Sequence, residues 1–129
     1  MIMFQKRILL AEDDPAILKV LKVRLEHEGF RVILATDGEQ VVEAVLEEGP
    51  PDLILLDVQM PKLNGYQVCH RLRRNSMTAK IPILILTGSD SELVRLSDQC
   101  VELGIDDWMK KPFRTQELLE KVQRLLMRR

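Results

Sequence analysis

The chain has 129 residues, 46% of them hydrophobic and 30% charged, with a formal net charge of −1. This length suits one domain spanning residues 1–129 with a single buried core, and the composition excludes a disordered chain. The near-neutral charge provides no general attraction to nucleic acid or to anionic membranes, and no apolar run approaches the ~20 residues of a transmembrane helix. We therefore expect a cytoplasmic protein whose two cysteines are reduced thiols.

The first half of the chain alternates short apolar runs with amphipathic helical patterns. Residues 7–11 are typical of a buried strand, and Asp14-Pro15 suits a helix start, with the aspartate as N-cap and the proline at the first helical position. Gly29 ends that helix. Residues 30–35 have strand character, and the apolar stripe that follows predicts a second helix, which Gly49 ends.

The run Leu53–Leu56 is apolar at every position and too short for a helix. Such a run is typical of a strand in the middle of a parallel sheet, buried on both faces. The strand ends at Asp57, and Pro61 stops the extended run. Ligands of open α/β sheets bind at the carboxyl ends of the strands, so Asp57 either terminates the strand or is the reactive group.

The second half of the chain continues the alternation. The predicted segments are, in order, a loop at 62–65, a helix reaching about Asn75, a strand at 81–87, a helix at 91–103 ended by Gly104, a strand at 107–110 and a last helix that Thr115 caps. Five strands thus alternate with five helices through short links. This order predicts a parallel sheet with helices on both faces, joined by right-handed crossovers.

Polar side chains follow four of these strands at the edge where their carboxyl ends converge. They are Glu12 and Asp13, Asp57, Thr87 and Lys111. Three carboxylates ~5 Å apart would repel by about 3 kcal/mol per pair, and a divalent cation relieves this repulsion. An all-oxygen site suits Mg²⁺. A carboxylate nucleophile, an ammonium and a hydroxyl complete the groups needed to accept a phosphoryl group on Asp57.

The motifs at these strand ends resemble those of the receiver domains of two-component response regulators. The matching residues are Glu12-Asp13, Asp57 with Met60-Pro61 and Asn64-Gly65, Leu86-Thr87-Gly88, Gly104 with Asp106-Asp107-Trp108, and Lys111-Pro112-Phe113. The resemblance covers essentially the whole chain. It implies a flavodoxin-like (βα)5 fold, a three-layer sandwich around a five-stranded parallel sheet of order 2-1-3-4-5.

The resemblance also implies the roles of the site residues. Asp57 would receive a phosphoryl group from the phosphohistidine of a sensor histidine kinase or phosphotransfer protein, and the domain would release it slowly by itself. Mg²⁺ would be held by Asp13, Asp57 and the backbone carbonyl of Gln59, with Glu12 acting through water. Lys111 would pair with the phosphoryl oxygens.

A switch is implied as well. Thr87 would shift toward the phosphoryl group, and Trp108, which stands where the family more often has tyrosine or phenylalanine, would move inward behind it. The surface around the fourth helix, fifth strand and fifth helix would then control a partner, an output domain or self-association to a homodimer. Whether the domain stands alone or begins a longer regulator is left open by the sequence.

A competing interpretation is a phosphohydrolase of the haloacid dehalogenase type, which also uses a strand-end aspartate, a threonine, a lysine and Mg²⁺. Those enzymes place a general acid two residues after the nucleophile, where this chain has Gln59, and an amide cannot protonate a leaving group. We therefore expect a signalling domain and not an enzyme.

Several other polar residues have ordinary structural interpretations. Asp14 is expected to cap a helix and not to bind metal. Asp106 and Asp107 are expected to be turn residues at the start of the last strand, outside the site. Arg71, Arg73 and Arg74 are expected to form a polar helix face first and a partner contact second.

Overall fold

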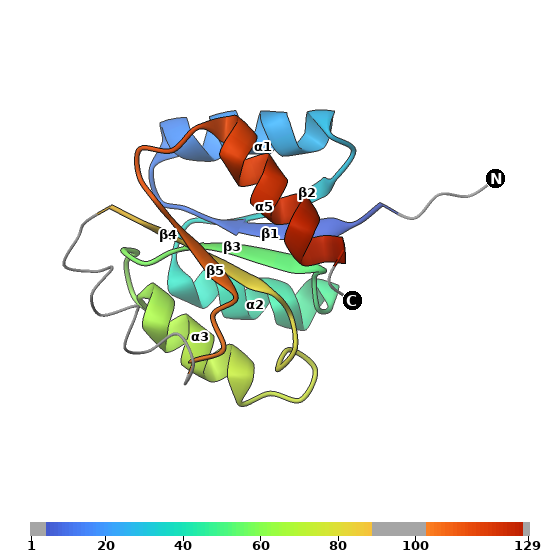
Figure 1. Ribbon diagram of the computed structural model, residues 1–129. Helices are drawn as coiled ribbons and strands as arrows, with labels where there is room; N and C mark the ends of the chain where they lie inside the picture. Colours follow the sequence, from blue (N-terminus) through green and yellow to red (C-terminus); the bar gives the residue numbers. More distant parts are fainter. Residues whose placement is uncertain (1–4, 89–102, 128–129) are drawn as a thin grey trace.

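The computed structural model describes residues 5–88 and 103–127, which form one five-stranded parallel sheet between two layers of helices (Figure 1). The strand order is β2-β1-β3-β4-β5. The strands are β1 (Arg7–Ala11), β2 (Arg31–Ala35), β3 (Leu53–Asp57), β4 (Ile83–Thr87) and β5 (Asp107–Lys110), and the described helices are α1 (Pro15–His27), α2 (Gly38–Glu48), α3 (Gly65–Arg73) and α5 (Thr115–Met127). Helices α1 and α5 cover one face and α2 and α3 the other. The predicted flavodoxin-like architecture and strand order are confirmed.

The central strand β3 explains why its sequence is apolar at every position. It pairs with β1 on one side and β4 on the other, with Leu55 beside both Leu10 and Leu84. Leu53 and Leu55 contribute to the core under α1 and α5, while Ile54 and Leu56 contribute to the core over α2 and α3. Since both faces are covered, every position needs an apolar side chain.

The predicted start and end of the first helix are confirmed. The Asp14 side chain accepts hydrogen bonds from the backbone N–H groups of Ala16 and Ile17, and Pro15 is the first helical residue. Gly29 follows the helix with a φ of 94°, a left-handed conformation that glycine adopts without steric cost. Asp14 therefore acts as a cap, as its position after the acidic pair predicts.

Several predicted boundaries differ from the structure by one or two residues. Helix α3 ends at Arg73 and not near Asn75. Strand β4 begins at Ile83 and not at 81, because Pro82 has no N–H to donate to a neighbouring strand. Helix α5 includes Thr115, and the carbonyl of Arg114 already accepts a hydrogen bond from the N–H of Leu118, so Thr115 is the first helical residue and not the cap before it.

Part of the prediction lies outside the described residues. The helix expected at 91–103 falls almost wholly in the range 89–102 and stays a prediction. Gly104, expected to end that helix, has a φ of 64°. Within the described ranges, none of the helices has the length and apolar character required to cross a bilayer.

Candidate functional site

An acidic cluster lies at the carboxyl edge of the sheet, where β1 and β3 end. Glu12 and Asp13 directly follow β1, and Asp57 is the last residue of β3. One carboxylate oxygen from each of the three lies within 4.8 Å of the other two. Glu12 is fully buried and Asp57 is 4% exposed, whereas Asp13 faces solvent. Parallel pairing of β1 with β3 thus brings together residues that are more than forty positions apart.

Lys111 lies against the two buried carboxylates. Its ammonium forms an ion pair with Glu12 and another with Asp57, whose Oδ2 is 3.3 Å from Nζ. The backbone places it there, because the N–H of Lys111 donates to the carbonyl of Thr87 at 2.6 Å, just beyond the paired part of β4 and β5. The cation therefore comes from one strand end and the anions from two others.

The charges of this group are strongly coupled. Burial raises the pKa of Asp57 to about 7, helped by the nearby Glu12 carboxyl and only partly opposed by Lys111. Burial also opposes ionisation of Glu12, but hydrogen bonds with Asp57 and Lys111 bring the pKa of Glu12 below its ordinary value. Burial likewise disfavours the charged Lys111, yet both carboxylates raise the pKa of Lys111 overall. Near neutral pH the site therefore consists of a charged Glu12–Lys111 pair and an Asp57 carboxyl that is only partly ionised.

The oxygen atoms at this edge suit a hard divalent cation. Asp13, Val58 and Gln59 are among the residues that line a hollow of about 470 Å³ beside the cluster. The backbone N–H of Gln59 donates to Oδ1 of Asp57 at 3.2 Å, so the chain after β3 turns back over the carboxylate. Carboxylates of different strands and a backbone carbonyl are the donor set that Mg²⁺ prefers.

The remaining strand end supplies a hydroxyl next to open space. Thr87, the last residue of β4, is fully buried. A Cβ atom at Gly88 would meet no other atom within 4 Å. Open space is therefore present at Gly88, next to Thr87.

Trp108 occupies the surface in this structure. It lies on β5 with 42% of its area exposed, while the next residue, Met109, is buried, as the alternation of a strand requires. Its expected inward movement stays a prediction, and the exposed ring is its starting position.

The predicted start of the last strand at Asp107 is confirmed. Asp107 is the first residue of β5 and pairs with Lys121 at 2.9 Å and Arg124 at 3.0 Å on α5. These bonds hold the pKa of Asp107 below its usual value despite burial, which acts in the opposite direction. Both aspartates lie outside the acidic cluster, so their predicted exclusion from it agrees with the geometry.

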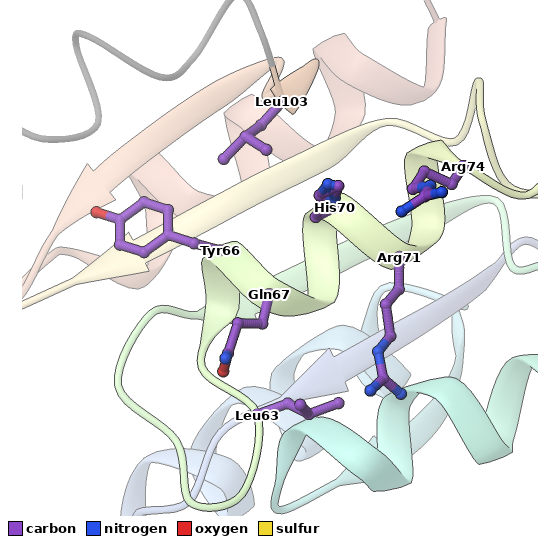
Figure 2. Close-up of a pocket in the computed structure, with 7 residues that line it drawn as sticks. All are labelled: Leu63, Tyr66, Gln67, His70, Arg71, Arg74 and Leu103. Carbon is purple, nitrogen blue, oxygen red and sulfur yellow. The ribbon is translucent and has the colours of Figure 1, made fainter.

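The arginines of α3 do not share one face. Figure 2 shows Arg71 and Arg74 at a shallow hollow of about 510 Å³ along the outside of the helix. Arg73 instead points inward and donates to the carbonyls of Leu103 and Gly104. The prediction of a common polar face is therefore wrong for Arg73, because the helix ends there and its long side chain reaches beyond the last turn.

Comparison with known proteins gives one family. The family model described as response regulator receiver domain matches residues 8–123. The chain is 42% identical over 123 residues to the alkaline phosphatase synthesis transcriptional regulatory protein PhoP of Bacillus subtilis (strain 168), covering 95% of this chain and 49% of that protein. It is 43% identical over 122 residues to the transcriptional regulatory protein CpxR of Escherichia coli (strain K12), covering 95% and 50%. The chain thus spans about half the length of the curated relatives it matches.

Solved receiver-domain and response-regulator structures are similar to this chain over nearly its whole length. The receiver domain of the sensor histidine kinase PA1611 from Pseudomonas aeruginosa PAO1, which has a magnesium ion coordinated in its active site cleft, aligns with a TM-score of 0.82 and 32% identity, covering 95% of this chain and 98% of that one. The chemotaxis response regulator CheY4 of Vibrio cholerae aligns with a TM-score of 0.86 and 27% identity, covering 95% and 99%.

Proposed function

Because the chain belongs to the family of response regulator receiver domains, we propose that it accepts a phosphoryl group on Asp57 in a two-component pathway. The observation that best supports this proposal is the position of Asp57. It is a buried carboxylate at the end of a strand, within 4.8 Å of Glu12 and Asp13 and paired with Lys111. Neither the carboxylates nor the lysine would by itself indicate a site that accepts a phosphoryl group. Together they form an anionic pocket with one fixed cation, which suits a phosphoryl group bound along with a metal ion.

The transfer makes one bond and breaks another. A carboxylate oxygen of Asp57 attacks the phosphorus of a partner's phosphohistidine in line, an O–P bond forms, and the N–P bond breaks to release the imidazole. Asp13, Asp57 and the carbonyl of Gln59 would hold Mg²⁺, with Glu12 acting through water. The bound cation would supply positive charge to the phosphoryl oxygens, and Lys111 would supply more from the end of β5. Both cations also favour the ionised form of Asp57, which is the nucleophile.

The donor is a sensor histidine kinase or phosphotransfer protein, and it has a suitable place to dock. A largely apolar hollow of about 460 Å³ lies between α1 and the start of α5, lined in part by Ile17, Val20, Lys111 and Phe113. Val20 is 58% exposed. Since Lys111 lines this hollow and also pairs with Glu12 and Asp57, a partner seated there would hold its phosphohistidine close to Asp57.

Labelling with a small phosphodonor tests the proposal. Acetyl phosphate with Mg²⁺ is expected to add one phosphoryl group, detected by intact mass, and Asp57→Asn is expected to add none. Glu43→Gln, a charge change on the exposed side of α2, serves as the control and should label normally. Undiminished labelling of Asp57→Asn would refute the assignment. Repeated turnover of an aryl phosphate would instead support the hydrolase interpretation.

The proposed switch gives a fluorescence prediction. Trp108 is the only tryptophan of the chain, so beryllofluoride with Mg²⁺, a stable mimic of the phosphoryl group, should change its emission as the ring leaves the surface. Thr87→Ala should lose this response, because it lacks the hydroxyl that would follow the phosphoryl group. An equal response in Thr87→Ala would exclude the route through Thr87 without affecting the role of Asp57.

The names and lengths of two relatives support a proposal for the output of the domain. PhoP and CpxR are named as transcriptional regulatory proteins, and about half of their length lies outside the match. We therefore propose that the phosphorylated domain acts through an attached output segment or a partner, by way of the surface around β5 and α5. Homodimer formation on phosphorylation is one form of this output. The domain itself is not proposed to bind nucleic acid.

A further inference from the structure

The loop that follows β3 rests directly on the start of α2. The N–H of Gly38 donates to the carbonyl oxygen of Pro61 at 3.3 Å. A Cβ atom at Gly38 would lie 2.1 Å from the carbonyl oxygen of Leu63 and 2.4 Å from its Cβ. Real Cβ atoms do not approach other atoms so closely, so no side chain fits at this position without moving the loop.

Lys62, which lies in this loop between Pro61 and Leu63, also holds the loop to the start of α2 by ion pairs. The ammonium of Lys62 lies 3.6 Å from Asp37 Oδ2 and 4.0 Å from Glu39 Oε2. Asp37 is 7% exposed, and its side chain also caps α2 by accepting from the N–H of Gln40 at 2.9 Å. Lys62 has a φ of 68°, a left-handed conformation that is unfavourable for a residue with a Cβ and needs support from its surroundings.

The far end of the loop is equally restricted. The N–H of Gly65 donates to the carbonyl of Val58 at 2.9 Å, and a Cβ atom at Gly65 would lie 2.8 Å from the Cα of Val58. Asn64 and Gln67 form a reciprocal capping box at the start of α3. The loop is therefore held to α2 and to α3. Gln59 lies in this loop, after the end of β3 and before the residues that contact α2.

We propose that Gly38 is a positioning residue for the divalent cation, acting with the Asp37–Lys62 pair to set the place of the Gln59 carbonyl. The proposal rests on the proposed function, which assigns that carbonyl to the metal. Gly38 contributes no ligand. A side chain there would push the loop that carries one ligand while leaving Asp13 and Asp57, which are on other elements, in place.

The helix itself gives little reason for glycine at this position. Gly38 is the first residue of α2 and is not among the glycines with positive φ, so alanine suits its backbone and has the higher helix propensity. The close contact with Leu63 is what excludes a side chain. A substitution here therefore acts on the loop and not on the formation of α2.

Calorimetric titration of the whole chain with Mg²⁺ tests the proposal. Gly38→Ala is expected to raise the Kd at least ~10-fold over wild type, the effect typical of residues that orient a metal ligand. Val45→Ala, a buried change two turns along the same helix, should lower the stability of the fold. Because it removes atoms and adds none against the loop, it should bind Mg²⁺ as wild type does. Thermal melts in chelator identify the variants that are folded.

A second variant keeps the test decisive if Gly38→Ala does not fold. Lys62→Met removes the ion pair from a side chain that is 60% exposed, and Lys62→Arg keeps it. Loss of a positive charge should by itself strengthen cation binding, so a raised Kd in Lys62→Met, restored in Lys62→Arg, indicates positioning. Wild-type Kd values in the folded Gly38 and Lys62 variants would overturn the proposal. A wild-type protein that binds no Mg²⁺ would overturn the proposed metal site, and this inference with it.

Discussion

Asp57→Asn is expected to raise the melting temperature of the metal-free protein at pH 8, although it removes the proposed phosphoacceptor. Burial and the adjacent Glu12 raise the pKa of Asp57 from 3.8 to about 7, so ionising it at pH 8 costs folding free energy. At ~1.4 kcal/mol per pKa unit, the difference sets an upper limit of about 4 kcal/mol. Asparagine is nearly isosteric and uncharged, and its amide can still donate a hydrogen bond to Glu12.

The pH dependence of this effect has a definite sign. A raised folded-state pKa means that the folded protein holds the Asp57 proton more tightly than the unfolded chain does. The stability that this proton contributes is fully present below pH ~4 and is lost as the pH rises through about 7. The asparagine variant resembles the protonated state at every pH. Its advantage over wild type should therefore be small near pH 4 and largest at pH 8.

Thermal melts between pH 4 and pH 8 in chelator would measure this advantage. Glu43→Gln removes one carboxylate from an exposed position of α2 and controls for the change in net charge, so it should melt close to wild type. Added Mg²⁺ should stabilise wild type more than Asp57→Asn, since the variant lacks one ligand charge. If Asp57→Asn melts at or below the wild-type temperature at pH 8, ionisation of the buried Asp57 carboxyl does not lower the stability of the folded protein.

Arg73→Ala is expected to lower the free energy of unfolding by about 3–5 kcal/mol, as is typical when a mostly buried charged group that satisfies several partners is removed. The Arg73 side chain is 16% exposed. It donates to the carbonyls of Thr78 and Ala79 at 3.1 and 3.0 Å, and to those of Leu103 and Gly104 at 3.2 and 2.6 Å. Alanine would leave all four carbonyls without this donor.

The same site joins the amino ends of two strands. Arg73 also lies 3.5 Å from Asp106 Oδ2, which accepts from the N–H of Ile83 at 2.8 Å, where β4 begins. Urea unfolding would quantify the loss. Arg71→Ala and Arg74→Ala, at exposed positions one or two residues away, are matched controls and should change stability by less than ~0.5 kcal/mol. Equal effects at the three positions would contradict the inward role of Arg73.

The sequence alone was sufficient for the fold and for the membership of the acidic cluster. Apolar runs covered on both faces have few alternatives to buried parallel strands, and parallel strands end at one edge. The residues following those runs, Glu12, Asp13, Asp57 and Lys111, therefore had to be neighbours, and the structure places a carboxylate oxygen of each acid within 4.8 Å of the others. Short-range capping signals such as Asp14 before Pro15 were also readable, because they act over three or four residues.

Only the tertiary structure decided which of these groups are buried and what supports them. Glu12 and Asp13 are adjacent in sequence, yet the first is fully buried and the second faces solvent. Arg73 turns inward because carbonyls thirty residues further along the chain lie within its reach. The contact of Gly38 with Leu63 joins the start of α2 to the loop after β3 and has no periodic signal in the sequence. Burial and contacts between loops depend on how distant elements pack, and a local pattern contains no information about atoms supplied by another part of the chain.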